Sequence, residues 1–133
     1  MMHRRFLGLG AFFAGTGVIL GAFAAHGLKK VLSPYLLDVF QTGVHYQFIH
    51  SIALILVSLM MLHLKTADLA QKYFKRAGIC FTIGILCFSG SLYLLALTGV
   101  KWFGPITPLG GLFFIIGWMM LLIASFKMKE VSQ

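Results

Sequence analysis

The fold is decided by residues 6–28, FLGLGAFFAGTGVILGAFAAHGL, a stretch that contains no Lys, Arg, Asp or Glu. Three more charge-free stretches follow it, at residues 39–64, 77–100 and 102–126. Each of the four exceeds the roughly 20 apolar residues that a helix needs to cross the hydrocarbon core of a bilayer. The sequence therefore predicts an all-α fold, an integral membrane four-helix bundle.

The composition excludes several other classes of protein. Only 11% of the residues are charged, against about 25% in soluble domains, so a soluble globule and a disordered tail are excluded. The net charge of +8 is explained by basic residues that flank the spans, so the expected partner is the lipid bilayer and not a nucleic acid. Cys80 and Cys87 lie about 10 Å apart on one predicted helix, which is too far for an intramolecular disulfide. Their spacing is not that of a metal site either.

The whole chain, residues 1–133, is expected to form a single four-span transmembrane domain, because no linker or repeat divides it. The spans are expected at about residues 6–25, 44–64, 77–97 and 108–126. Ser33 and Pro34 are the residue types of an N-cap and a first helical position. A helix from there to residue 64 would measure about 46 Å, more than the bilayer core. Its first turns are therefore predicted to form a short interfacial helical segment before span two.

Residues typical of helix ends lie between the spans. Gly27 is a candidate C-cap for span one, and Gly99 marks the expected end of span three. The residues expected to cap the later helices are Thr66 or Asp68 before span three, and Thr107, followed by Pro108, before span four.

The basic residues divide unequally between the two sides of a four-span bundle. Three lysines lie on one side: Lys29, Lys30 and Lys101. Eight basic residues lie on the side of both chain ends: Arg4, Arg5, Lys65, Lys72, Lys75, Arg76, Lys127 and Lys129. By the positive-inside rule, both termini are expected in the cytoplasm, an N-in/C-in topology.

Small residues recur at helical spacing in the first span. Residues 22–24, AFA, resemble a signal-peptidase site, but the apolar run before them is longer than a signal core, so we retain it as a span. Gly17, Gly21 and Ala25 recur every fourth residue, as a close helix–helix contact requires. The glycines expected to serve helix packing are Gly17, Gly21, Gly90, Gly110 and Gly111. Trp118 is interpreted as a packing residue.

Polar residues gather in the half of the bundle that faces away from the chain ends. They lie near the end of odd-numbered spans and the start of even-numbered ones, which meet at that side. The candidates for a polar cluster or ligand site are His26, Gln47, His50, Ser89, Ser91 and Tyr93, and the secondary candidates are Asp38, Thr42, His45, Tyr46 and Thr107. Polar groups are costly in hydrocarbon and normally face the bundle interior. Three interpretations stay open: a hydrogen-bonded clasp that fixes the helix register, a ligand or ion site, and a site of chemistry. The sequence contains no arrangement typical of a catalytic residue set and no metal site.

Four separated motifs resemble one known family. They are GAFAAHGL at residues 21–28, TGVHYQ at 42–47 with His50 beyond it, FSGSLY at 88–93, and ITPLGG at 106–111 with Gly117 and Trp118 beyond it. In this order they are similar to domain-of-unknown-function family 423, small bacterial membrane proteins with animal relatives called transmembrane protein 256. The resemblance implies a four-span, multi-pass protein of the bacterial inner (plasma) membrane, and supplies no activity, substrate or cofactor. Two residues depart from the pattern: Ala24 replaces the usual Gly, and His45 stands where many relatives carry Glu.

Three hypotheses of function follow from the sequence. The first is a non-enzymatic structural or interaction protein, for which a homo-oligomer is one form of assembly. The second is transport of a small solute, a proton or another ion through an outward-facing polar vestibule, because histidine changes its charge near neutral pH. The third is a haem or redox membrane protein with His26 and His50 as axial ligands. The first is the hypothesis we carry forward, and it requires no cofactor.

Overall fold

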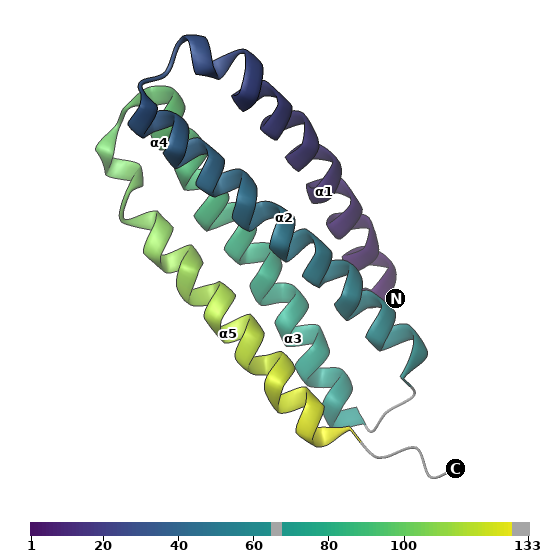
Figure 1. Ribbon diagram of the computed structural model, residues 1–133. Coiled ribbons are helices and arrows are strands. Elements are labelled where there is room, and N and C mark those ends of the chain that lie inside the picture. Colours follow the sequence, from purple (N-terminus) through teal and green to yellow (C-terminus); the bar gives the residue numbers. More distant parts are fainter. Residues whose placement is uncertain (65–67, 129–133) are drawn as a thin grey trace.

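The computed structural model describes residues 1–64 and 68–128, and helices make up its architecture. Four successive rods run antiparallel, so that the start of the first helix and the end of the last helix lie toward the same end of the bundle (Figure 1). In chain order the elements are α1 (Met2–His26), the 3-10 helix η1 (Leu28–Lys30), α2 (Pro34–His63), α3 (Asp68–Gly84), the π-helix η2 (Ile85–Ser89), α4 (Gly90–Thr98), the 3-10 helix η3 (Lys101–Phe103) and α5 (Ile106–Lys127). The third rod consists of α3, η2 and α4 in direct succession.

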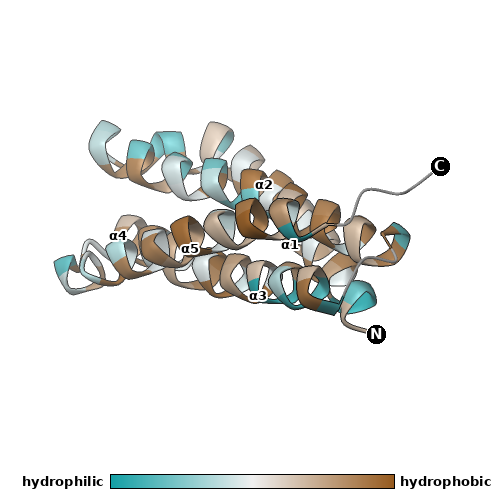
Figure 2. Cartoon of the chain, turned by 90° about the horizontal axis from the view of Figure 1, so that it is seen from below, coloured by the Kyte–Doolittle hydropathy of each residue, from teal (hydrophilic) through white to brown (hydrophobic). Residues whose placement is uncertain are grey.

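Four helical segments are long and apolar enough to cross a membrane. They comprise Met2–Lys30, Pro34–His63, Asp68–Thr98 and Lys101–Lys127. Hydrophobic residues cover the middle of the rods and hydrophilic ones gather toward the ends (Figure 2). The prediction of an all-α four-helix membrane protein is confirmed.

The second rod is one continuous helix. Ser33 is its N-cap and accepts a hydrogen bond from the backbone N–H of Leu36 at 3.3 Å, with Pro34 at the first position. The 30 residues of α2 measure about 45 Å. The interfacial segment that we expected is therefore the first part of α2 and has no boundary of its own near residue 44.

Two expected helix ends differ in the structure. The fourth rod begins at Ile106 with Pro105 at the N-cap, so Thr107 lies inside the first turn and does not cap it. Pro108 is tolerated there because the first N–H groups of a helix have no intrahelical acceptor. Gly27 does follow α1, but its φ of −72° is right-handed because the chain continues into η1.

The other expected caps lie after and before the third rod. Gly99 ends α4 with a φ of +69°, the left-handed conformation that favours glycine, as we expected. Asp68 is the first residue of α3 and not a residue before it. Thr66 lies outside the described residues.

The helix α2 lies at the centre of the packing. It contacts α1 on one side and α3 and α4 on the other, while α5 packs on α3 and η2. One apolar cluster fills the half of the bundle at the chain ends and includes Phe74, Phe81 and Leu54. A second, around Phe40 and Val44, fills the opposite half.

Glycines permit two close approaches between helices. At Gly110 of α5, an added Cβ would collide with the backbone of Phe88, so α5 lies directly against η2. At Gly10 of α1, it would lie 2.9 Å from the carbonyl oxygen of Ser51 and would also collide with the side chain of Ile55. Close contacts of this kind between small residues are the usual way in which membrane helices associate.

Some of the other glycines that we expected to serve helix packing do so and one does not. Gly17 faces the ring of Phe48 at 3.2 Å and Gly21 faces Val44 at 3.4 Å, so both serve the contact between α1 and α2. Gly111 has ordinary contact with Phe88, at 3.8 Å. The expectation for Gly90 is wrong, since a Cβ there would meet nothing within 4 Å.

Candidate functional site

Gln47 is the centre of a buried polar network. Its side chain is 3% exposed. The amide Nε2 donates to the carbonyl oxygen of Phe13 at 2.8 Å and to the hydroxyl of Thr16 at 3.0 Å, both on α1. The amide Oε1 accepts a hydrogen bond from the hydroxyl of Tyr93 on α4, at 2.6 Å. One side chain of α2 therefore connects the first and third rods.

His50 lies one turn further along α2 and is also 3% exposed. Its Nε2 lies 3.0 Å from Nε1 of Trp118 on α5, and its Nδ1 lies 2.8 Å from the carbonyl oxygen of Tyr46. An indole N–H can only donate and a carbonyl can only accept. The imidazole therefore accepts at Nε2 and carries its proton on Nδ1, which is the neutral form of histidine.

Aromatic rings enclose this imidazole. The ring of Phe114 stacks on His50 with centroids 3.5 Å apart and planes 9° apart. Phe81 lies at 5.4 Å and the Trp118 ring at 5.8 Å. These apolar faces exclude competing hydrogen-bond partners, so the two bonds of His50 are well protected.

Serines connect the remaining pairs of helices. Ser89 in η2 donates to the carbonyl oxygen of Gly43 in α2 at 2.7 Å. The hydroxyls of Ser91 in α4 and Thr107 in α5 lie 2.6 Å apart. Together with Gln47, His50, Tyr93, Thr16 and Trp118, these residues form what we call the polar clasp, which links all four rods.

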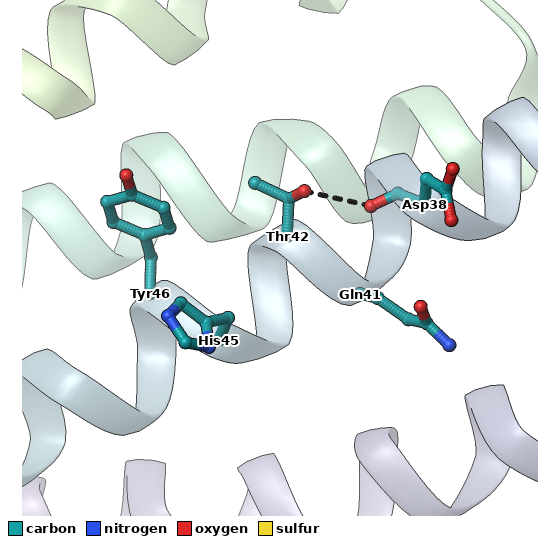
Figure 3. A pocket seen from close by; sticks show the side chains of 5 residues that line it. All are labelled: Asp38, Gln41, Thr42, His45 and Tyr46. Atoms are coloured by element: carbon teal, nitrogen blue, oxygen red, sulfur yellow. Dashed lines mark hydrogen bonds between the residues drawn. The ribbon is translucent and has the colours of Figure 1, made fainter.

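The structure does not bring every candidate into the polar clasp. His26 is exposed at the end of α1 and lies outside the polar clasp, and within the described residues its side chain makes no hydrogen bond. The secondary candidates Asp38, Thr42, His45 and Tyr46, with Gln41, line a shallow cavity of about 370 Å³ on α2. Figure 3 shows these side chains on successive turns, with the Thr42 hydroxyl bonded to the carbonyl oxygen of Asp38 at 2.9 Å.

Tyr46 lies between this cavity and the polar clasp. Its ring centroid is 4.5 Å from that of Phe88 and 6.1 Å from that of His50. The cavity is therefore separated from His50 by packed aromatic rings.

Two members of the polar clasp are not among the candidates expected from the sequence. The expectation for Trp118 is packing alone, although a buried indole N–H usually finds a partner. Thr16 was not singled out, although it is the only side chain with a hydroxyl in residues 6–25. Both signals were present, but each partner lies more than 30 residues away along the chain.

The chemistry available in the polar clasp is hydrogen bonding between groups that already have partners. Among the described residues, no buried side-chain nitrogen or oxygen lacks a hydrogen-bond partner. Within the same residues, no group of three His, Cys, Asp or Glu side chains has the proximity of a metal site. The lone pair of His50 that could ligate or accept a proton is directed at the Trp118 N–H.

Comparisons with known proteins find relatives that are named as membrane proteins. The family model described as protein of unknown function, DUF423, matches residues 20–111. A UPF0382 membrane protein of Staphylococcus aureus is 43% identical over 122 residues, which cover 92% of this chain and 95% of the relative. A UPF0382 membrane protein of Haemophilus influenzae is 41% identical over 130 residues, which cover 98% of this chain and all of the relative. A third, from Bacillus subtilis, is 41% identical and covers 92% of this chain and 96% of the relative. No solved structure matches the chain.

Proposed function

This chain belongs to the DUF423 family of membrane proteins, and from that premise we propose that it acts as a non-enzymatic structural or interaction protein of the bacterial inner membrane. The observation that carries the proposal is the occupancy of the polar clasp. Each of its polar side chains is bonded to another part of the same chain. Such a network holds helices in place and leaves no reactive group open.

The energetics of the membrane interior support this role. Interhelical hydrogen bonds in membrane proteins contribute about 0.6 kcal/mol on average and up to about 2 kcal/mol. The bonds of Gln47, Ser89, Ser91 and His50 each join a different pair of rods. Together they stabilise one relative arrangement of the four rods. The bundle then presents a constant surface to lipids and to a partner protein.

The test compares assembly and fold in the same variants. Trp118→Phe loosens the polar clasp from α5, and Ser125→Ala removes only a hydroxyl bonded within α5, at 2.7 Å to the carbonyl oxygen of Leu122. We expect chemical crosslinking in native membranes to give one discrete larger species for the wild type and for Ser125→Ala, and less of it for Trp118→Phe. A monomer in all three samples would contradict a role in assembly.

A homo-oligomer would need a surface other than the small-residue face of α1. Gly17 and Gly21 already contact Phe48 and Val44 of the same chain. Replacing either glycine by Leu is therefore expected to unfold the protein before it changes the size of an assembly.

The proposed topology places the basic end of the bundle in the cytoplasm. Among the described residues this end holds Arg4, Arg5, Lys72, Lys75, Arg76 and Lys127, and the opposite end holds Lys29, Lys30 and Lys101. A membrane-impermeant maleimide should label a Lys30→Cys variant in intact cells, and a Lys127→Cys variant only after lysis. The reverse pattern would overturn the orientation.

The transport hypothesis has one favourable observation, the polar cavity at the opposite end. Asp38 and His45 line it, and Tyr46 closes it toward the bundle interior against Phe88. Conduction would require these aromatic rings to separate. Proton flux into liposomes that is lost in His45→Ala would favour transport over the structural role.

The haem hypothesis requires a free imidazole nitrogen within the bundle. Ligation through Nε2 of His50 would break its bond with Trp118, and His26 lies exposed at the end of α1. A Soret band in protein purified from haem-replete cells would revive this hypothesis.

A further inference from the structure

A groove opens between α1 and α3 at the basic end of the bundle. These two helices have little mutual contact, because α1 packs mainly on α2. A cavity of about 190 Å³ lies between them, lined by Met2, Phe6, Leu9, Ile79, Thr82 and Ile83. The hydroxyl of Thr82 donates to the carbonyl oxygen of Gly78 at 2.8 Å, so this hydroxyl is not a free donor in the apolar part of the wall.

A second, separate cavity lies further along α1, where this helix faces the later part of the third rod. It measures about 260 Å³ and is lined on α1 by Phe12, Thr16 and Leu20, and on the third rod by Leu86 and Gly90. The α1 positions recur every three or four residues from Met2 to Leu20, so they share one helical face. The empty space beside Gly90 belongs to this second cavity.

Arg5 lies at the mouth of the first cavity and lines it. Its side chain is exposed, and within residues 1–64 and 68–128 no carboxylate pairs with it. Arg76 lies one turn before Ile79 on the same face of α3, by helical spacing. An arginine can bind a phosphate through two parallel hydrogen bonds.

We propose that this groove binds one anionic phospholipid, with its phosphate on Arg5 and one acyl chain along Leu9 and Ile83. The chain of one leaflet spans about 15 Å, half of the hydrocarbon core, which corresponds to about ten helical residues. Counted from Arg5, it reaches the start of the second cavity. A helix of another protein is about 10 Å wide, so it would fit only if α1 moved away from α3.

Native mass spectrometry of the intact protein tests the proposal. The probes are phosphatidylglycerol and phosphatidylcholine with identical acyl chains, added at equal concentrations. We expect the wild type to retain one phosphatidylglycerol in preference to phosphatidylcholine. In Arg5→Gln this retention should fall about tenfold, which corresponds to about 1.4 kcal/mol. Arg4→Gln is the matched control, because Arg4 is exposed at the same end and does not line the cavity.

A second pair of variants tests the acyl-chain path. Thr82→Phe fills the first cavity and should reduce lipid retention, whereas Val18→Phe places the same ring on a residue that is 60% exposed outside the groove. Helical content measured by circular dichroism shows that each variant is folded, and Arg5→Lys keeps the charge if Arg5→Gln does not fold.

Three results would overturn the proposal. Equal retention of the two lipids would exclude recognition of the net negative charge, because both headgroups contain the phosphate. Equal losses in Arg4→Gln and Arg5→Gln would indicate attraction to the whole basic end and not a site. A dimer that disappears in Thr82→Phe would assign the groove to a second copy of the chain.

Discussion

The indole N–H of Trp118 donates to Nε2 of His50 over 3.0 Å, and this bond joins α5 to α2 within the bundle. It also determines on which nitrogen the imidazole carries its proton. From the sequence alone, His50 is a candidate for a titrating or ligating group. In the structure it is a fixed part of the contact between α2 and α5.

The bond between Trp118 and His50 should contribute measurably to stability. Trp118→Phe keeps an aromatic ring but removes the N–H donor, so Nε2 of His50 loses its partner. We expect a loss of about 1–2 kcal/mol in the free energy of unfolding, measured by reversible unfolding in mixed micelles. Trp102→Phe is the control, since Trp102 is 73% exposed and should change stability little. Equal effects of the two substitutions would mean that the His50 bond adds nothing.

The tautomer of His50 is open to direct observation. ¹⁵N NMR of histidine-labelled protein should show the His50 ring with its proton on Nδ1, because Nε2 accepts from Trp118 and Nδ1 donates to the carbonyl oxygen of Tyr46. In Trp118→Phe the second form should become populated. A wild-type spectrum with the proton on Nε2 would contradict the assignment of the network.

Gln47 should be the most sensitive polar residue of the clasp. Gln47→Leu removes the bonds to Phe13, Thr16 and Tyr93 and leaves the Tyr93 hydroxyl without its acceptor. We expect a loss of about 2–3 kcal/mol in the free energy of unfolding. Adding Tyr93→Phe should recover part of it, because both partners are then apolar.

The control for Gln47 lies on the same helix. Gln41→Leu changes an exposed glutamine beside the shallow cavity of α2 and should be close to neutral. The coupling is measured by comparing free energies of unfolding. If Tyr93→Phe lowers the stability of Gln47→Leu by as much as it lowers that of the wild type, the two side chains are not coupled.

Adjacent glycines of α5 should respond differently to substitution. A Cβ at Gly110 would collide with the backbone of Phe88. A helical backbone cannot move aside by a change of rotamer, as a side chain can. Gly110→Ala should therefore cost about 2–3 kcal/mol of unfolding free energy. Gly111→Ala adds a Cβ at ordinary contact distance, 3.8 Å from the Phe88 ring, and should be neutral or stabilising by up to about 1 kcal/mol. Thermal unfolding of both variants checks the difference, and equal melting temperatures would contradict it.

The parts of this structure that follow from local sequence were predictable. Charge-free length determines the four spans, and the residue types of Ser33 and Gly99 determine two of the helix ends. Gln47, Ser89 and Ser91 were assigned to the bundle interior from the cost of polar groups in lipid, and all three are buried there.

Pairings between distant residues could not be read in the same way. The depth of His50 and Trp118 in the membrane follows from the spans, but their contact depends on the rotation of α5 about its axis. Because α5 is apolar on all its faces, its sequence does not specify that rotation. His26 was grouped with the cluster by depth alone, and its direction on α1 places it at the exposed surface. Gly90 was grouped by its neighbours Ser89 and Ser91, and it faces open space.

The π-helix η2 determines which way the residues after it face on the third rod. A π-turn holds one residue more than an α-turn, so each residue of α4 is rotated by about 100° from where an unbroken α-helix would place it. Deleting one residue within Ile85–Ser89 would let the rod become regular and would turn Tyr93 away from Gln47. In a loop, the loss or gain of one residue is often harmless. Within η2 it would rotate every residue of α4 about the helix axis, so this span tolerates such changes less easily than its apolar composition suggests.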